Sequence, residues 1–229
     1  MKDYSVLERN LGYSFQDKKL LTHALTHSSY ASEHDLAYSE NNERLEFIGD
    51  AYLDAIIGNK LYEVMPNQPE GVLSKTRANI VCERSLATIA RNIGLGDFLF
   101  LGNGEEMYGG REKDSILADA VEAIIGAIIR ESGYDCADRV VLKLFEENIL
   151  LALQGKLYHD YKTALQEKLQ ERYKNVRIQY ESVSESGPDH RKVFTVQVKV
   201  DDAVLATGSG HSKKAAEQEA ARKVLMKGV

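Results

Sequence analysis

The chain has 229 residues, of which 43% are apolar and 28% charged, and its formal net charge is −6 at pH 7. This composition is that of an ordinary globular protein, long enough for one large domain or for a large and a small one. Residues 1–10 contain no apolar run that could act as a secretory signal. The longest apolar stretch, residues 115–129, is interrupted by Asp119 and Glu122, so it does not predict a membrane span.

Charge distribution and cysteine usage bear on partners and location. Residues 1–158 hold 16 Lys and Arg against 25 Asp and Glu, a net −9, whereas residues 159–229 hold 13 against 10, a net +3. An acidic front and a basic tail predict two modules with different partners. Cys82 and Cys136 are far apart and have no neighbours at metal-ligand spacing, so we expect reduced thiols in a cytoplasmic protein.

Residues 1–153 follow the apolar period of an α-helix nearly throughout. A turn before residue 18, two prolines and a glycine after residue 65, and a glycine-rich stretch from residue 94 separate the helical regions. Ser115 is a candidate N-cap and Gly133 a candidate C-terminal stop for the most apolar region. The expected helical regions are 17–27, 44–65, 72–94, 115–133 and 135–153.

Residues 160–229 have a different pattern. An amphipathic helix with Leu165 and Leu169 at i, i+4 comes first, and three segments rich in Val, Tyr, Phe and Thr then predict strands over 176–184, 192–200 and 203–210. A helix over 212–228 closes the module. We therefore expect a mainly α protein: an all-helical domain over 1–153, a linker over 154–159, and a small α+β domain of order α-β-β-β-α over 160–229.

Residues 42–58 place three carboxylates on one face of a predicted helix. Glu43, Glu46 and Asp50 are spaced i, i+3 and i+7, and no basic residue four positions on relieves them. Like charges at such spacings destabilise an isolated helix by about 0.2–0.5 kcal/mol per pair. The segment therefore carries a charge penalty that needs an explanation.

A second pair of carboxylates, Asp119 and Glu122, lies in residues that are apolar nearly all round. A helix of that kind is normally buried, and a buried carboxylate must be paired, protonated or bound to a metal. Salt bridges to arginines such as Arg44, Arg77 or Arg84 would satisfy this pair. The pair alone does not decide between an ion pair and a metal site.

The two helices together could bring four carboxylates to one site, namely Glu46, Asp50, Asp119 and Glu122. Hard divalent cations such as Mg²⁺ prefer carboxylate oxygens, whereas the few histidines and two cysteines do not suit zinc. Clustered carboxylates on Mg²⁺ are a common means of activating water and stabilising phosphoryl-transfer charge. A di-iron centre in a helical bundle would need Glu-x-x-His pairs, which neither acidic pair forms.

Residues 41–58, NNERLEFIGDAYLDAIIG, closely resemble the signature of the ribonuclease III family, with Ile48 a conservative departure. Three further blocks resemble the family's conserved blocks in the same order: LGYSFQDKKLLTHALTHSSY, PEGVLSKTRANIV and LGNGEEMYGGREKDSILADAVEAIIGAI. Residues 160–229 resemble a double-stranded RNA-binding domain. The resemblance covers essentially the whole chain and matches the domain order of the bacterial members.

The resemblance implies a metal-dependent catalytic site made by Glu46, Asp50, Asp119 and Glu122. This site would hold two Mg²⁺ ions, which Mn²⁺ could replace. Glu43 and Glu70 fall at positions of accessory acidic residues, although both could be solvated surface charges. Phe47 falls where family members bury an aromatic ring in the partner subunit, which implies a homodimer, although Phe47 could also belong to the core. We interpret His27 as a structural histidine and not as a ligand.

The tail would bind duplex RNA by its shape, across two minor grooves and the phosphates between them. Lysines at a helix N-terminus oppose the helix dipole, so Lys213 and Lys214 are explained by an anionic ligand there, or are simply solvated. Gln166 and Glu167 could otherwise be plain helix-surface residues. The residues implied to contact RNA are Thr163, Gln166, Glu167, His190, Ser212, Lys213 and Lys214.

The sequence therefore predicts a cytoplasmic homodimeric endoribonuclease that cleaves double-stranded RNA by metal-assisted in-line attack of water, without an organic cofactor or a membrane partner. By resemblance, the products carry 5′-phosphate and 3′-hydroxyl ends, and the substrates include ribosomal RNA precursors and other structured transcripts. A non-catalytic RNA-binding protein would not need four convergent carboxylates. A carboxylate-bridged oxidoreductase would have no use for the RNA-binding tail.

Overall fold

The most apolar predicted helix forms the centre of the first half of the chain in the computed structural model, which describes residues 3–155, 157, 161–173, 176–187, 192–201, 203–210 and 212–227. The chain divides into unit 1, residues 1–157, and unit 2, residues 158–229. The helices of unit 1 are α1 (Ser5–Leu11), α2 (Lys18–Ala24), α3 (Ser28–Glu33), α4 (Glu43–Val64), α5 (Glu70–Ile80), α6 (Glu83–Asn92), α7 (Asn103–Met107), α8 (Asp114–Ser132), α9 (Tyr134–Leu144) and α10 (Glu146–Leu153). Short 3₁₀ turns lie at Tyr38–Glu40, Leu95–Phe98 and Gly110–Glu112.

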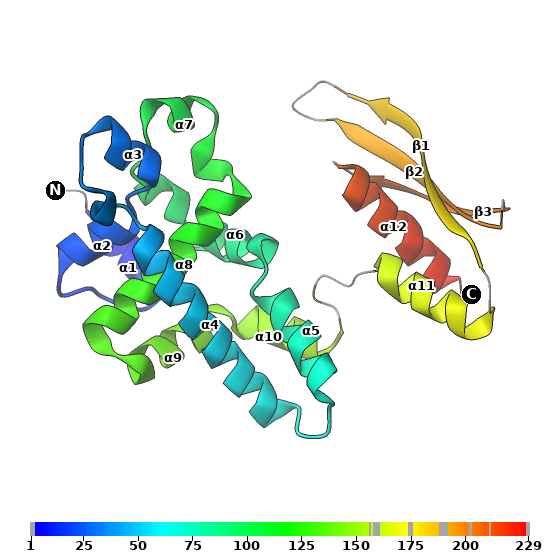
Figure 1. Cartoon of the computed structure of the whole chain (residues 1–229), viewed down its shortest axis with the longest axis horizontal. Coiled ribbons are helices and arrows are strands. Elements are labelled where there is room, and N and C mark those ends of the chain that lie inside the picture. The colour runs from blue at the N-terminus through cyan, green and yellow to red at the C-terminus, as the bar shows by residue number, and fades with distance from the viewer. Residues whose placement is uncertain are drawn as a thin grey trace. The chain divides into compact units, whose positions relative to one another are not determined.

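Helix α8 is buried because its sequence is apolar on almost every side, as predicted. Helices α2, α4, α6 and α9 pack around it, and Figure 1 shows α4 running across it. Its buried residues are Ile116, Leu117, Ala118, Ala120, Val121, Ala123, Ile124, Ile125, Gly126, Ala127 and Ile128. The two carboxylates of α8, Asp119 and Glu122, are therefore held on a rigid, central element.

Two glycines let α4 and α8 touch backbone to backbone. A Cβ atom at Gly49 of α4 would lie 1.8 Å from the carbonyl oxygen of Glu122, and a Cβ at Gly126 of α8 would lie 2.1 Å from that of Leu45. Any larger side chain at either position would keep the helices apart. This close crossing sets the carboxylates of the two helices opposite each other.

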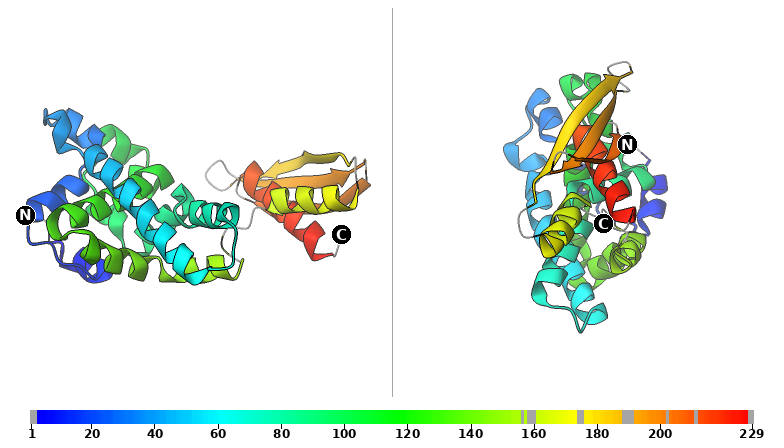
Figure 2. Two further views of the ribbon diagram at one scale, coloured as in Figure 1. Left: turned by 60° about the horizontal axis from the view of Figure 1, so that its bottom comes forward. Right: turned by 90° about the vertical axis from the view of Figure 1, so that its right-hand side faces the viewer.

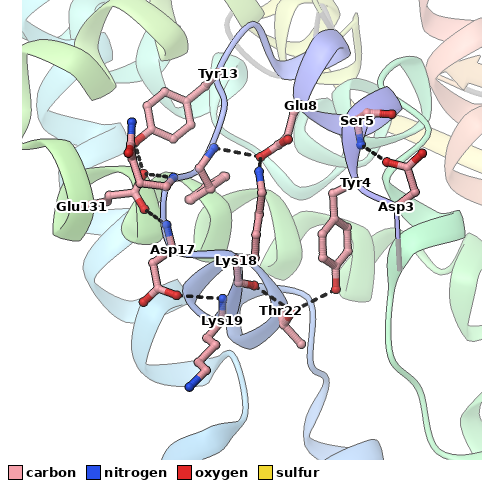
Figure 3. A network of polar contacts seen from close by, with 12 residues as sticks. Asp3, Tyr4, Ser5, Glu8, Tyr13, Asp17, Lys18, Lys19, Thr22 and Glu131 are labelled. Atoms are coloured by element: carbon pink, nitrogen blue, oxygen red, sulfur yellow. Dashed lines mark hydrogen bonds and ion pairs between the residues drawn. The ribbon is translucent and has the colours of Figure 1, made fainter. Parts of the chain in front are cut away.

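A network of hydrogen bonds fixes the chain between α1 and α2 to the end of α8 (Figure 3). The Glu131 carboxylate accepts hydrogen bonds from the Tyr13 hydroxyl and from the backbone N–H of Asp17, the latter at 2.8 Å. The half of the network on α1 is centred on Glu8, which accepts from the Phe15 N–H at 2.8 Å. Burial and the bond to Glu131 raise the pKa of Tyr13 to about 12.

Two of the predicted helices are each divided in two. The region predicted over 72–94 breaks at Cys82, whose backbone is extended, and the region over 135–153 breaks at Phe145. In each case the second helix begins with a glutamate, Glu83 or Glu146, which favours a helix N-terminus. An apolar period does not reveal such a short break.

The prediction of Ser115 as an N-cap is wrong, and so is the prediction of 94–110 as a plain connection. Helix α8 begins one residue earlier, at Asp114, with Lys113 in the extended N-cap position. The glycine-rich segment contains α7, whose N-terminal N–H groups, those of Asn103 and Gly104, donate to the Glu33 carboxylate of α3. A capping acid so distant in sequence leaves no local signal.

Unit 2 has the predicted order α-β-β-β-α, which confirms the predicted fold class. Its elements are α11 (Tyr161–Arg172), β1 (Ile178–Ser186), β2 (Val193–Val200), β3 (Ala203–Gly210) and α12 (Lys213–Met226). The sheet is antiparallel in the order β1-β2-β3, and both helices lie on one of its faces (Figure 2). The core between them consists of Leu165, Leu169, Val198, Ala206, Ala220, Ala221 and Val224.

Two properties of the described residues concern the environment of the chain. Among those residues, no helix combines the length and the apolar character needed to cross a bilayer. Cys82 and Cys136 are both free thiols.

Candidate functional site

Three of the four predicted carboxylates meet at the crossing of α4 and α8. Glu46, Asp119 and Glu122 each offer one oxygen, and these oxygens lie within 4.8 Å of one another. All three side chains are half-buried. The i, i+3 spacing of the acids on α8 and the close approach at Gly49 bring them together.

Burial is the main factor that disfavours the charged form of all three, and the charges of neighbouring acids add to it. Burial is the main cause that raises the pKa of Glu46, followed by the charge of Asp119. Burial also raises the pKa of Asp119. Burial, followed by the charges of Asp50 and Glu46, raises the pKa of Glu122 to about 8. Without a cation, this site keeps a proton at neutral pH.

The fourth predicted carboxylate, Asp50, lies at the edge of the group. Its side chain is exposed and is not one of the three whose oxygens meet. Its charge nevertheless raises the pKa of both Glu46 and Glu122. Asp50 is therefore close to the group but on its solvent side.

The direction of these pKa shifts argues against the salt-bridge alternative for Asp119 and Glu122. An arginine beside a carboxylate would lower its pKa, whereas the pKa of both residues is raised. Arg77, one of the arginines considered, instead pairs with Asp54 of α4 at 3.5 Å. Carboxylate oxygens in a half-buried, uncompensated group suit a hard divalent cation such as Mg²⁺.

The predicted accessory acids lie outside the group of three. Glu43 opens α4, adds to the charge that raises the pKa of Glu46, and forms a hydrogen bond that raises the pKa of Tyr38. Glu70 is exposed at the start of α5 and accepts a hydrogen bond from the Ser74 hydroxyl at 2.6 Å.

His27 occupies a structural position, in line with its interpretation. Its Nδ1 accepts a hydrogen bond from the Ser29 N–H at 3.2 Å and so caps α3. Its charge also offsets part of the pKa rise of Asp119, so the ring lies near the acidic group.

Phe47 is not a core residue. Its side chain is 81% exposed, although it stands on α4 between Glu46 and Asp50. It borders a pocket of about 750 Å³ whose other lining residues are Leu20, His23, Tyr38, Glu43, Arg44, Leu45, Ile48 and Arg130. This exposure rules out the core alternative for Phe47, and the contact with a partner subunit stays a prediction.

Unit 2 brings three of the predicted RNA-binding residues to one groove. Thr163 and Gln166 of α11 and Lys214 of α12 line a groove of about 840 Å³. Glu167 is exposed on α11. His190 lies outside the described residues.

The start of α12 presents both predicted lysines to solvent. Ser212 is the N-cap, and its side chain accepts from the Ala215 N–H at 3.1 Å. Lys213 lies 3.4 Å from Glu185 of β1, and its ammonium is 5.9 Å from the centre of the Phe194 ring. An exposed ion pair of this kind is weak, so it leaves Lys213 available to an anion.

Sequence reasoning missed two features of the site. The first is the pair Gly49 and Gly126, whose signal is a glycine in the interior of each helix. The second is Asp54, which follows Asp50 at i+4 and whose charge contributes to the raised pKa of Glu122. The sequence offered its ion-pair partner, Arg77, only as a salt-bridge partner for Asp119 and Glu122 of α8.

A helical unit with a half-buried acidic group suited to hard cations, followed by an α-β-β-β-α unit with lysines at a helix start, is the arrangement of an enzyme that acts on nucleic acids. Residues 17–149 match the family model described as Ribonuclease-III-like, and residues 161–227 match the Double-stranded RNA binding motif. The chain therefore belongs to the ribonuclease III family, as the motifs of its sequence indicated.

Relatives match over nearly the full length. The chain is 51% identical over 221 residues to Ribonuclease 3 of Caldanaerobacter subterraneus subsp. tengcongensis, with 96% of each chain covered. It is 47% identical over 227 residues to Ribonuclease 3 of Campylobacter jejuni, with 99% of this chain and 98% of the relative covered. A solved nuclease domain of ribonuclease III from Campylobacter jejuni matches with a TM-score of 0.60 and 49% identity, covering 65% of this chain and 99% of that one. In that solved domain, the region involved in dimer formation shows structural flexibility.

Proposed function

We propose that this chain hydrolyses phosphodiester bonds of double-stranded RNA at the acidic group of unit 1, leaving 5′-phosphate and 3′-hydroxyl ends. The observation that carries the proposal is the meeting of Glu46, Asp119 and Glu122 within 4.8 Å, in a chain of the ribonuclease III family. Structured transcripts in the cytoplasm, ribosomal RNA precursors among them, are the substrates that family membership favours.

The proposed cofactor is Mg²⁺, two ions per site, with Mn²⁺ able to replace it. Bound divalent ions supply an activated water and offset the negative charge of the reacting phosphate. Glu46, Asp119 and Glu122 would hold them from the buried side, and Asp50 from the solvent side. The donor set is all carboxylate, which suits hard cations.

Unit 2 would capture the duplex and present it to unit 1. The groove that contains Thr163, Gln166 and Lys214 supports a contact with one RNA face, and the exposed lysines at the start of α12 support contacts with phosphates. Ser212, Glu167 and His190 complete the proposed RNA-binding set. Glu43 and Glu70 are proposed as accessory acids.

The proposed assembly is a homodimer in which Phe47 of each subunit enters the pocket of the other. An 81% exposed phenylalanine beside a pocket of about 750 Å³ supports this contact. Two sites in one dimer would cut one strand each and leave a short 3′ overhang.

The proposed domain boundaries are 1–153 for the nuclease domain, 154–159 for the linker and 160–229 for the RNA-binding domain. Two compact units that divide after residue 157, and family matches over 17–149 and 161–227, support boundaries in this region.

The test is cleavage of a long RNA duplex by the full chain in Mg²⁺, in EDTA, and with the variant Glu122→Gln. We expect cleavage only by the unsubstituted protein with Mg²⁺, while Glu122→Gln still shifts the duplex on a gel. Glu147→Gln, an exposed acid on α10, is the matched control and should cleave normally. Normal cleavage by Glu122→Gln would overturn the assignment of the site, and cleavage of single-stranded RNA alone would overturn the substrate.

A further inference from the structure

Arg77 forms an ion pair on α4 close to the acidic group, which itself contains only carboxylates. The Arg77 Nε on α5 is 3.5 Å from the Asp54 carboxylate on α4. Asp54 follows Asp50 by one helical turn, so the two acids share a face of α4. Because Asp50 is the proposed metal ligand on the solvent side of the acidic group, the ion pair lies one helical turn along α4 from the candidate metal site.

The Arg77 side chain is held against α4 at a second point. Its Cδ and Nη1 atoms lie 3.7 Å from the position that a Cβ at Gly58 would occupy. The side chain thus runs along the surface of α4 between Gly58 and Asp54. Both members of the ion pair remain 40% exposed, so the guanidinium is oriented yet open to solvent.

A guanidinium in this position has donors to spare. Arginine carries five N–H donors in a planar fork, and the contact with Asp54 is made through Nε. The fork geometry suits the oxygens of a phosphate. A single exposed ion pair of this kind stabilises a fold by only about 0–1 kcal/mol, so fold stability alone is a weak explanation for it.

The negative charge of unit 1 would repel RNA, and the Arg77 side chain would reduce that repulsion locally. Residues 1–158 carry a net charge of −9, and RNA brings one negative charge per phosphate. Divalent ions at the acidic group would compensate the phosphate that reacts, but the next phosphates along the strand would meet Asp54. Arg77 neutralises Asp54 and offers hydrogen-bond donors at the same place.

We propose that Arg77 binds an RNA phosphate next to the scissile bond, with Asp54 as the residue that positions its guanidinium. This inference rests on the proposed function, because it assigns a substrate contact at the same site. Arg77 acts on substrate binding, so its loss should raise KM and leave kcat largely intact.

The test compares duplex cleavage by the full chain and by three variants over a range of salt concentrations. Arg77→Gln should raise KM by about tenfold, the worth of one hydrogen bond to a charged group, and should lower the slope of log KM against log salt by about 1. Arg77→Lys keeps the charge and should retain the slope. Arg91→Gln is the control, because Arg91 is also ion-paired and 41% exposed but joins Asp114 near the start of α8; its KM and slope should be unchanged.

An unchanged KM and salt slope in Arg77→Gln would overturn the inference, and so would a loss of kcat with KM unchanged. The same loss of slope in Arg91→Gln would show a general charge effect and would also overturn it. A failure of the unsubstituted protein to cut duplex RNA would contradict the proposed function instead. In that case the salt slope of duplex binding in Ca²⁺ would still decide whether Arg77 contacts RNA.

Discussion

Replacing Gly49 by alanine should disable the acidic site without touching any carboxylate. The added Cβ would lie 1.8 Å from the Glu122 carbonyl oxygen and 2.6 Å from its carbonyl carbon. Both atoms belong to the backbone of the most deeply buried helix, so neither can rotate away. The two helices must therefore move apart at the point where their carboxylates meet.

The size of the movement follows from the contact distances. Ordinary van der Waals contact begins near 3.4 Å, so a 1.8 Å approach falls short of it by about 1.6 Å. A separation of that size between α4 and α8 would draw Glu46 away from Asp119 and Glu122, whose oxygens now lie within 4.8 Å. A misplacement of about 1 Å can cost about 10²-fold in rate, so we expect kcat to fall at least that far. Overpacking should also cost about 1–3 kcal/mol of stability, reduced by the better helix propensity of alanine.

The assay is single-turnover cleavage of duplex RNA in saturating Mg²⁺, with thermal melting and Mg²⁺ titration of the same preparations. Gly104→Ala is the matched control, because Gly104 is also helical but has nothing within 4 Å of its Cβ position. It should keep its activity and its Mg²⁺ affinity. Gly126→Ala should resemble Gly49→Ala, since its Cβ would lie 2.1 Å from the Leu45 carbonyl oxygen. Full activity and unchanged melting in Gly49→Ala would refute the idea that this contact positions the site.

Five further outcomes follow from the charges and contacts described above. The free energy of unfolding of the metal-free protein should fall as pH rises from about 5 to about 8, because folded Glu122 keeps its proton up to about pH 8 but unfolded Glu122 only to about pH 4.5. Calorimetry should show Mg²⁺ affinity rising over the same range, since the ion displaces that proton. Lys213→Ala with Lys214→Ala should weaken duplex binding and lower its salt slope by about 2, measured by filter binding. Phe47→Asp should convert dimer to monomer in light scattering, because it places a charge in an apolar contact. Glu131→Ala should lower the free energy of unfolding by about 1–3 kcal/mol in denaturant titrations, because three donors lose their acceptor.

The three predictions made with substitutions each have a matched control. Lys199→Ala removes a cation from the sheet of unit 2 and should leave the salt slope of duplex binding unchanged. Tyr62→Asp alters another exposed aromatic on α4, 74% exposed, and should leave the dimer intact. Glu147→Ala should leave stability unchanged. A control variant that changes as much as its test variant would contradict the role given to the residue tested. For the pH dependence, a free energy of unfolding of Glu122→Gln that still falls between pH 5 and 8 would show that Glu122 is not its cause.

The parts of the structure that sequence predicts well are those encoded by local pattern. Helix α8 is buried because nearly every residue of 115–129 is apolar, and its two acids face one way because they are three residues apart. The α-β-β-β-α order of unit 2 follows from the change between helical and strand periods. The approach of Glu46 to Asp119 could be predicted only because an unpaired, buried carboxylate destabilises the fold, which called for a common ligand.

The parts that sequence does not predict depend on contacts between distant residues. Helix α7 begins where it does because Glu33, about seventy residues earlier, accepts from its N-terminal N–H groups. The exposure of Phe47 depends on which neighbours cover the N-terminal part of α4, so a core position and a subunit contact have the same local pattern. The ion pair of Arg77 with Asp54 depends on the angle at which α5 folds back on α4.

The charge penalty of α4 and the burial of α8 have a common consequence. A protein optimised for stability alone would pair or remove these acids, because burial and the charges of Asp50 and Asp119 raise the pKa of Glu46 and Glu122, which opposes folding at neutral pH. The packing of α8 against α2, α4, α6 and α9 limits the helix movement by which the acids could separate. We therefore expect the site to take up either a proton or a cation, and at neutral pH a divalent ion would relieve more repulsion than one proton does. Under the proposed function that ion is small and highly charged, which is the kind of ion that metal-assisted cleavage of RNA uses.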